Sequence, residues 1–313
     1  MTAIVPFAER LHEAIDRKRS PLAVGLDPVL DRLPPEVLRA ARDRHGERPA
    51  GVTAALELFC GGVLEAVEPW AAAVKVNIAF FEQYHLPGLV AYAGVLAEAR
   101  RRGFLVIGDI KRSDIGSTAE AYAAGHLTAG PGGAASFAVD AVTLNPYLGR
   151  DGIVPFIRTA VRHGGGVYVL VRTSNPSSVE LQQLPVGADT VAGHVAELVA
   201  RWGAEVGPPD GYAPVGAVVG ATFPGELAAL RARMPRTPWL VPGYGAQGGR
   251  AEDLRAVFDA RGHGALVNAS RSILYAYSTP ARTTSGAGAW KDAVAQAARQ
   301  AAEELEAVRH AGS

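Results

Sequence analysis

Residues 105–118 read LVIGDIKRSDIGST, a short apolar run that changes abruptly into a charged one. The first part, Leu105–Gly108, is apolar on both alternating faces of an extended chain. Strands of this kind belong to parallel sheets that are covered on both faces. The stretch therefore predicts a buried parallel strand whose carboxyl end delivers Asp109 and the charged residues after it to one edge of the sheet.

The same kind of apolar run recurs along the chain. The further candidate strands are Leu22–Leu26, Ala73–Asn77, Ala141–Leu144, Val167–Val171, Ala217–Gly220, Trp239–Val241 and Ala265–Val267. Helical patterns lie between them at Thr53–Val67, Leu89–Arg102, Ile153–Arg162, Thr190–Val206, Glu226–Arg233 and Ala251–Ala260, with a long Ala/Glu-rich helix at Ala289–Arg309. Eight strands that alternate with helices predict an α/β fold, the (β/α)8 TIM barrel. An open doubly wound sheet shows the same alternation and stays the alternative.

The chain has 313 residues, more than the roughly 250 that such a barrel typically needs. The surplus falls in segments 28–49 and 175–189, which contain prolines and polar or charged residues, and in segment 277–288, which is rich in small and polar residues. We interpret the first two as loop insertions and the third as a linker before the last helix, which ends near residue 310. The sequence thus predicts a single domain over residues 1–313.

Composition argues against several classes of protein. Lys+Arg and Asp+Glu both number 31, so the net charge is zero and a nucleic-acid partner is not expected. A hydrophobic content of 48% predicts a packed core rather than disorder. The single cysteine, Cys60, cannot form an internal disulfide framework or a cysteine zinc site. The early residues are charged, and we find neither a signal peptide nor a bilayer-spanning run, which predicts a cytoplasmic protein with no membrane partner.

The densest charged cluster follows strand Leu105–Gly108 and contains Asp109, Lys111, Arg112 and Asp114. Side chains of an extended segment alternate between faces, so Asp109 and Lys111 would point the same way. At the carboxyl end of a barrel strand, that direction is the mouth where active sites lie. A surface loop with solvated charges is the alternative interpretation.

Lys75 interrupts an otherwise apolar strand, AVKVN. An unpaired buried ammonium is costly, so Lys75 should have an anionic partner, and Asp109 lies one strand–helix unit later. An array of Lys75, Asp109, Lys111 and Asp114 would suit a reaction that develops negative charge on a substrate carbon, because fixed charges need not reorient. A structural ion pair and a Schiff-base role for Lys75 remain open.

Segment 241–249, VPGYGAQGG, contains the pattern G-x-G-x-x-G. A dinucleotide site would use this pattern early in the fold, but here it follows the seventh strand. A phosphate site is the better interpretation, because loops after strands seven and eight commonly form one, glycine amides can approach an anion, and a helix would begin nearby. Arg271 would add a bidentate charge. A structural turn with a surface arginine is the alternative. Asp27, after the first strand, could bind a sugar hydroxyl or cap its loop.

These residues together resemble the orotidine 5'-phosphate decarboxylase family, from about Leu22 to Arg271. The most specific piece is Asp109-x-Lys111-x-x-Asp114-Ile115-x-x-Thr118, and the segments DIKRSDIGST and AVKVNIAFFEQY are similar to the longer bacterial branch. The resemblance implies cofactor-independent decarboxylation of orotidine 5'-phosphate to UMP and CO2 in pyrimidine biosynthesis. It also implies no metal, and a homodimer whose active sites are shared.

The resemblance assigns roles to individual residues. Lys75, Asp109 and Lys111 would form the charged array within one subunit, with Lys111 as the acid that protonates C6 and Asp109 near the departing carboxylate. Asp114 would reach the neighbouring subunit's site, with Thr118 beside it. The other substrate contacts would come from Asp27 and Lys75 to the ribose, Ser174 to the pyrimidine, and Gly245, Gln247, Ser270 and Arg271 to the phosphate. Ser270 stands where many relatives have glycine, which leaves its backbone donor in place.

Three other functions remain as alternatives. A sugar-phosphate decarboxylase or synthase on the same barrel also uses Asp-x-Lys-x-x-Asp, but it looks metal-dependent and places an acidic residue where this chain has Lys75. A non-catalytic phosphate-ligand-binding barrel would show affinity without turnover, and the intact charged array argues against it. A nicotinamide oxidoreductase would rest on the glycine pattern alone.

Overall fold

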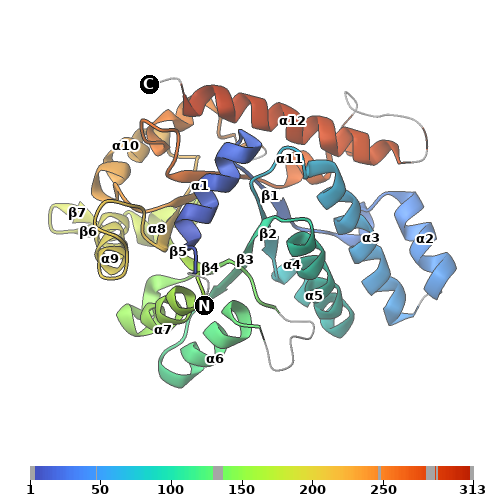
Figure 1. Ribbon diagram of the computed structural model, residues 1–313, viewed down its shortest axis with the longest axis horizontal. Coiled ribbons are helices and arrows are strands. Elements are labelled where there is room, and N and C mark those ends of the chain that lie inside the picture. The colour runs from blue at the N-terminus through green and yellow to red at the C-terminus, as the bar shows by residue number, and fades with distance from the viewer. Residues whose placement is uncertain are drawn as a thin grey trace.

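The computed structural model describes residues 4–46, 48–129, 137–245, 248–279, 286 and 288–310. Eight parallel strands form one closed barrel in the order β1-β10-β9-β8-β5-β4-β3-β2, and the helices surround it (Figure 1). The pairing of the first strand with the last, in which Ala23 lies opposite Asn268, closes the sheet. Closure confirms the (β/α)8 barrel and excludes the open doubly wound alternative.

The barrel strands begin and end close to the predicted positions. They are β1 (Leu22–Leu26), β2 (Ala73–Asn77), β3 (Leu105–Arg112), β4 (Ala141–Leu144), β5 (Gly166–Arg172), β8 (Val215–Val219), β9 (Trp239–Pro242) and β10 (Ala265–Ala269). The largest difference is at β3, which continues past its apolar run to Arg112. Hydrophobic patterning marks apolar runs only, so it does not reveal a strand that continues through a buried charged residue, as β3 does at Asp109.

The α-helices number twelve within the described ranges. They are α1 (Phe7–Lys18), α2 (Pro35–His45), α3 (Pro49–Val67), α4 (Ala79–Glu82), α5 (His85–Arg101), α6 (Gly116–Leu127), α7 (Arg150–Arg162), α8 (Val179–Gln182), α9 (Val191–Ala204), α10 (Pro224–Arg233), α11 (Arg271–Leu274) and α12 (Ala289–Arg309). The final helix has the predicted bounds. Helices α1 and α6 were not predicted. The apolar residues of α1 recur at the spacing of an amphipathic helix, so its signal was present, whereas α6 is rich in small residues and has a weak apolar pattern.

Helix α1 closes the amino-terminal end of the barrel. Its buried face carries Phe7, Leu11 and Ile15, which belong to the same apolar cluster as inward residues of the strands. The ring of Phe7 lies edge-on to Tyr168 of β5, with centroids 5.9 Å apart. A Cβ atom on Gly166 would lie 2.5 Å from the Phe7 ring, so a glycine is needed there. The carboxyl end of the barrel is therefore the end available to a ligand.

Two of the predicted features need correction. The insertions are not simple loops: segment 28–49 contains α2, and segment 175–189 contains α8 and the hairpin strands β6 (Pro185–Val186) and β7 (Asp189–Thr190). The predicted helix Ala251–Ala260 is instead a short 3-10 helix, Glu252–Val257. Most of the predicted linker 277–288 lies outside the described residues.

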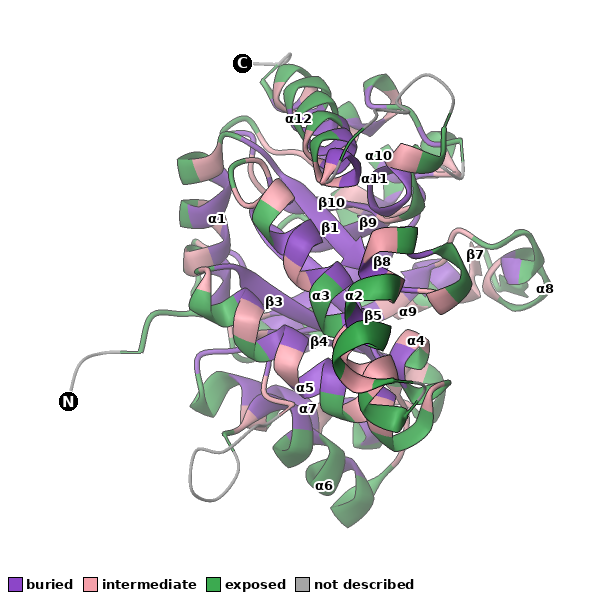
Figure 2. Cartoon of the chain, turned by 90° about the vertical axis from the view of Figure 1, so that its right-hand side faces the viewer, coloured by how far each residue is buried: buried purple, intermediate pink, exposed green. Residues whose placement is uncertain are grey.

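By length and composition alone, α3 could cross a bilayer. Among the described residues it is the one helix that meets this criterion. The prediction that no such run exists was therefore wrong in this respect. Half of its apolar window is buried within the fold, and α3 packs against α2, α5 and α12. Figure 2 shows buried residues along α3, and they belong to the main apolar core.

Candidate active site

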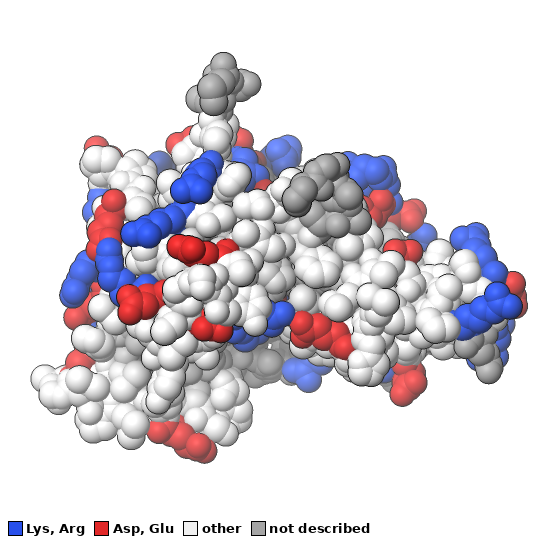
Figure 3. All heavy atoms as spheres, turned by 90° about the horizontal axis from the view of Figure 1, so that it is seen from below, with Lys and Arg blue, Asp and Glu red and all other residues white. Residues whose placement is uncertain are grey.

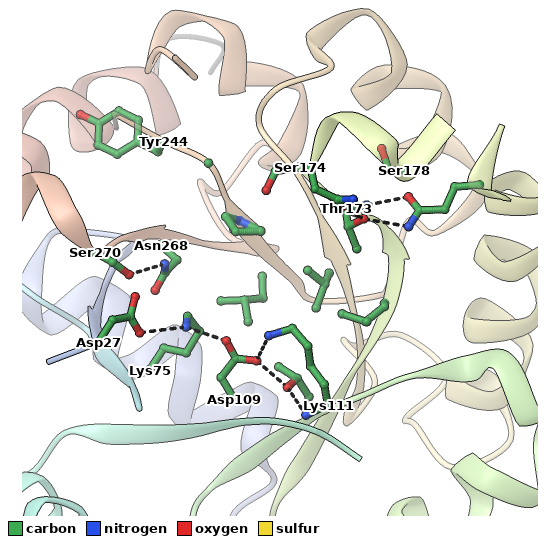
Figure 4. A pocket seen from close by; sticks show the side chains of 18 of the residues that line it. Asp27, Lys75, Asp109, Lys111, Thr173, Ser174, Ser178, Tyr244, Asn268 and Ser270 are labelled. Atoms are coloured by element: carbon green, nitrogen blue, oxygen red, sulfur yellow. Dashed lines mark hydrogen bonds and ion pairs between the residues drawn. The ribbon is translucent and has the colours of Figure 1, made fainter. Parts of the chain in front are cut away.

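A cavity of about 570 Å³ opens at the carboxyl ends of the strands (Figure 4). Its floor is apolar and includes Leu170, Val218 and Leu240, which belong to the barrel's interior cluster. Its polar lining comes mainly from six strand ends and includes Asp27, Lys75, Asp109, Lys111, Thr143, Thr173, Ser174, Asn268, Ser270 and Arg271. A concave site with an apolar floor and convergent polar groups has the usual construction of a small-molecule site.

Asp109 lies at the centre of a chain of ion pairs. The Lys75 Nζ atom is 2.7 Å from one carboxylate oxygen of Asp109, and the Lys111 Nζ atom is 2.6 Å from the other. The hydroxyl of Thr143 donates a third hydrogen bond to Asp109, at 2.8 Å. Lys75 and Asp109 are buried, whereas about half of the Lys111 side chain is exposed. The predicted contact of Asp109 with both lysines is therefore present in the structure.

The charges in this chain stabilise one another. Burial alone would raise the pKa of Asp109, but the two ammonium groups outweigh burial and hold that pKa well below its usual range. Burial alone would lower the pKa of Lys75, but Asp109 and Asp27 outweigh it and raise that pKa above its ordinary value. At neutral pH both groups are therefore charged, which gives the cavity a fixed pattern of charge.

Asp27 supplies a second carboxylate to the cavity. It follows β1, and its Oδ1 atom lies 3.9 Å from the Lys75 Nζ atom. This oxygen is buried and accepts no hydrogen bond from the described residues. A buried carboxylate oxygen of this kind usually has a hydrogen-bond donor, so Asp27 is well placed to bind a hydroxyl group of a ligand.

Lys111 has a left-handed backbone, with φ 44°. For a residue with a side chain this conformation costs roughly 1–2 kcal/mol. The pairing of β3 with β4 shifts register between Gly108 and Arg112, and the backbone N–H of Lys111 donates to the hydroxyl of Thr143 at 3.1 Å. Asp109 and Lys111 thus meet through a bulge, not through the regular alternation that the sequence suggested.

The remaining predicted ligand contacts divide into two groups. Ser174, Ser270 and Arg271 line the cavity, and Arg271 has no ion-pair partner among the described residues. Gly245 instead lines a separate cavity of about 510 Å³, and Gln247 lies outside the described residues. The 3-10 helix that replaces the predicted 251–260 helix also removes the helix N-terminus that was expected to assist anion binding.

Asp114 and Thr118 do not join the cavity of their own chain. Asp114 is half-buried, and its carboxylate accepts a hydrogen bond from the backbone N–H of Ile115. Thr118 is exposed on α6. The structure therefore brings together three members of the predicted four-residue array, with Asp27 as the nearest second carboxylate.

Thr143 and Asn268 also line the cavity and were not predicted from the sequence. Each is a single polar residue within an apolar strand, in AVTL and ALVNA. The same signal identified Lys75 and could have identified them. Among the residues that the structure describes, no group of three or more His, Cys, Asp or Glu side chains could hold a metal ion.

A closed (β/α)8 barrel with convergent charged residues at its carboxyl end defines the class of TIM-barrel enzymes. The family model described as "Orotidine 5'-phosphate decarboxylase / HUMPS family" matches residues 53–285. The chain belongs to this family, which confirms the resemblance found in the sequence.

Individual relatives match over nearly the whole chain. An orotidine 5'-phosphate decarboxylase of Rhodopirellula baltica is 44% identical over 304 residues, which cover 96% of this chain and 99% of the relative. An orotidine 5'-phosphate decarboxylase of Deinococcus radiodurans is 45% identical over 271 residues, which cover 86% of this chain and 89% of the relative. The solved structure of Leishmania donovani OMP decarboxylase has a TM-score of 0.75 and 32% identity, and the match covers 98% of this chain and 100% of that one.

Proposed function

We propose that this chain is a carboxy-lyase that converts orotidine 5'-phosphate to UMP and CO2, without a cofactor, in pyrimidine biosynthesis in the cytoplasm. The observation that carries the proposal is the ion-paired chain Lys75–Asp109–Lys111 at the cavity, whose half-exposed end is the ammonium of Lys111. Family membership supplies the substrate, and this geometry supplies a charged group that can act on it.

The chemical step needs a cation beside the reacting carbon. When the bond between C6 and the carboxylate breaks, CO2 leaves and the electron pair stays on C6. The Lys111 ammonium stabilises that pair and then transfers a proton, which forms the new C6–H bond. Lys111 is left as a neutral amine that regains a proton from solvent. Asp109 holds Lys111 in place and, near the departing carboxylate, favours its loss.

Ion pairing alone does not account for the rate enhancement. Enzymes typically lower barriers by about 8–23 kcal/mol, and part of that must come from binding groups that do not react. Arg271 is the cation available for the 5'-phosphate, and backbone amides near Ser270 and in the loop after β9 would assist it. Gly243, Gly245 and Gly248 in that loop have positive φ angles, which gives its amides unusual directions. We assign Gln247 to the same phosphate.

The cavity lining also suits the rest of the nucleotide. Asp27 and Lys75, which lie 3.9 Å apart, would hold ribose hydroxyls. Ser174 lies across the cavity from them and would bind the pyrimidine (Figure 4). The apolar floor would exclude water from the reacting carbon, which strengthens the electrostatic effect of Lys111.

Asp114 and Thr118 would complete the active site of a second copy of this chain in a homodimer. Three exposed apolar side chains surround the loops that carry or face Asp114: Ile115 (53% exposed), Tyr147 (77%) and Leu148 (45%). Clustered exposed apolar residues usually mark an interaction surface. Figure 3 shows the side on which α6 and α7 lie in Figure 1, and wide areas of it carry no charged side chain.

The direct test is an absorbance assay with orotidine 5'-phosphate after treatment with EDTA. We expect the substrate absorbance to disappear with formation of UMP, at the same rate with and without EDTA. No loss of absorbance would contradict the decarboxylase proposal. Strict dependence on added metal would instead favour the metal-dependent sugar-phosphate enzymes of the same barrel.

A further inference from the structure

Asn268 is the least expected polar residue of the cavity. It lies on the inner side of β10, and 6% of its surface is exposed. Its amide nitrogen donates to the hydroxyl of Ser270 at 3.3 Å, while its carbonyl oxygen is buried and accepts no hydrogen bond from the described residues. Buried amide oxygens of native proteins usually have a partner. A partner from a bound ligand would satisfy this one.

The neighbouring strand is adapted to the Asn268–Ser270 pair. A Cβ atom on Gly25 of β1 would lie 1.9 Å from the Ser270 hydroxyl oxygen and 3.3 Å from the Asn268 carbonyl oxygen. The two side chains thus occupy the space that a side chain at position 25 would fill. Ser270 fits here because position 25 is glycine.

This arrangement locates the free oxygen of Asn268 relative to the ligand groups. Gly25 pairs with Lys75 in the sheet and lies two residues before Asp27. Figure 4 shows Asn268 and Ser270 beside Asp27 and Lys75, with Thr173 and Ser174 on the opposite side of the cavity. The oxygen therefore lies on the side of the cavity that carries Asp27 and Lys75, the two residues proposed to hold the ribose.

We propose that the Asn268 carbonyl oxygen accepts a hydrogen bond from a ribose hydroxyl of the nucleotide, and that Ser270 fixes the amide in the orientation that makes this possible. This inference rests on the proposed function. An oxygen acceptor repels a phosphate dianion, and one of the two amide N–H groups is already engaged by Ser270. The donors of a nucleoside monophosphate are its ribose hydroxyls and the pyrimidine N3–H. Because the pyrimidine is assigned to Ser174 on the opposite side of the cavity, a ribose hydroxyl is the donor that fits.

The test measures affinity by calorimetry for three probes: UMP, 2'-deoxy-UMP and 3'-deoxy-UMP. We expect the native protein to bind UMP about 3- to 30-fold more tightly than the analogue that lacks the recognised hydroxyl, as for one buried hydrogen bond. In the Asn268→Ala variant this ratio should fall to within about twofold of unity, with little change in affinity for that analogue. Ser270→Ala should reduce the same ratio less.

The outcomes separate this inference from others. Equal losses of affinity for UMP and both analogues in Asn268→Ala would assign Asn268 to the phosphate or to packing and overturn the inference. Unchanged ratios for both analogues would also overturn it. If the native protein decarboxylates orotidine 5'-phosphate, the proposed function stands even where these results overturn the role of Asn268. If the native protein binds UMP but shows no turnover, the proposed function is contradicted, whereas the role of Asn268 in binding is still decided by the affinity ratios.

Two controls keep the comparison clean. In the native protein the Ser278 hydroxyl donates to the Tyr275 carbonyl, outside the cavity. Ser278→Ala removes this hydroxyl and should leave the affinity ratios of UMP to its two deoxy analogues unchanged. Asn268→Ser replaces the buried amide with a smaller polar group, for use if Asn268→Ala does not fold. Because a serine hydroxyl is too short to reach the same point, it should show the same loss of discrimination.

Discussion

Lys111 combines an exposed ammonium with a strained backbone, and these two properties can be separated by mutation. Replacing it by alanine or by glycine removes the ammonium, so kcat should fall by at least about 100-fold in either variant. Glycine also relieves the strain at φ 44°, so Lys111→Gly should be more stable than Lys111→Ala by about 1 kcal/mol. Urea unfolding and single-turnover kinetics measure the two effects. Equal stabilities would show that the left-handed conformation carries no strain.

Arg271 should affect binding much more than stability. It is exposed, and within the described part of the chain no carboxylate pairs with it. Arg271→Ala should weaken UMP binding by about 10- to 100-fold, the value of one charge-assisted hydrogen-bonding group, and change the free energy of unfolding by less than about 0.5 kcal/mol. Calorimetry and denaturant unfolding check both. Unaltered affinity together with a destabilised barrel would remove Arg271 from the phosphate site.

At the scale of elements, the segment after β5 is held by a buried cation. Arg172 is fully buried and donates to Glu226 of α10 at 2.8 Å and to the hydroxyl of Ser178. Gln182 of α8 donates to the Thr173 hydroxyl at 2.7 Å and accepts from the Thr173 backbone N–H at 2.9 Å. These bonds fix the chain directly beside Ser174, the residue proposed to bind the pyrimidine.

Gln182 is therefore expected to act as a positioning residue for the base. Gln182→Ala should weaken UMP binding by about 3- to 10-fold, the effect of one to two lost hydrogen bonds. Affinity for ribose 5-phosphate, which has no base, should stay within about twofold. Parallel titrations with the two ligands make the comparison. An equal loss for both would indicate general disorder of the cavity rather than positioning of Ser174.

Helix α1 makes stability depend on pH. His12 stacks on His263 with ring centroids 4.2 Å apart, and burial together with the His263 ring lowers the pKa of His12 to about 4. In the unfolded chain the His12 imidazole has its ordinary pKa of about 6.5. As the pH falls, the unfolded chain therefore takes up a proton at His12 before the folded protein does. The free energy of unfolding consequently decreases between about pH 6.5 and 4. In His12→Gln the loss of unfolding free energy over this pH range should be smaller by about 1–2 kcal/mol, a value reduced because His12 is partly exposed. Urea unfolding from pH 7 to 4.5 measures it, and an unchanged slope would exclude His12.

The fold was predictable from the sequence because parallel strands buried on both faces give continuous apolar runs. Three strands have the predicted bounds, β1 among them. Helix α1 was not predicted although Phe7, Leu11 and Ile15 recur at the four-residue spacing of an amphipathic helix. The 251–260 helix failed because its apolar spacing also fits a shorter 3-10 helix.

The site was predictable where a charge interrupts a strand, as for Lys75 and Asp109. It was less predictable where geometry depends on a bulge, as for Lys111, or on a contact between strands, as between Asn268 and Gly25. Asp114 shows a different limit, because its proposed role in a second copy of the chain would leave no signal in the structure of one chain.

At the scale of the whole molecule, the proposed dimer makes a quantitative prediction. Lys111→Ala and Asp114→Ala chains should each be nearly inactive alone. If Asp114 acts across the interface, a mixed dimer contains one intact site, and an equal mixture after subunit exchange should recover about a quarter of native activity. Enzyme assays after native mass spectrometry of the mixture check this. Inactive mixtures with verified mixed dimers would contradict shared sites.

The packing of Phe7, Leu11 and Ile15 into the barrel also bears on how products depart. With that end filled, the gas and the nucleotide share a single route to solvent, on the side of Ser174 and Arg271. Both products of the proposed reaction must therefore leave through the opening by which the substrate enters, so bound UMP would obstruct entry of the next substrate molecule.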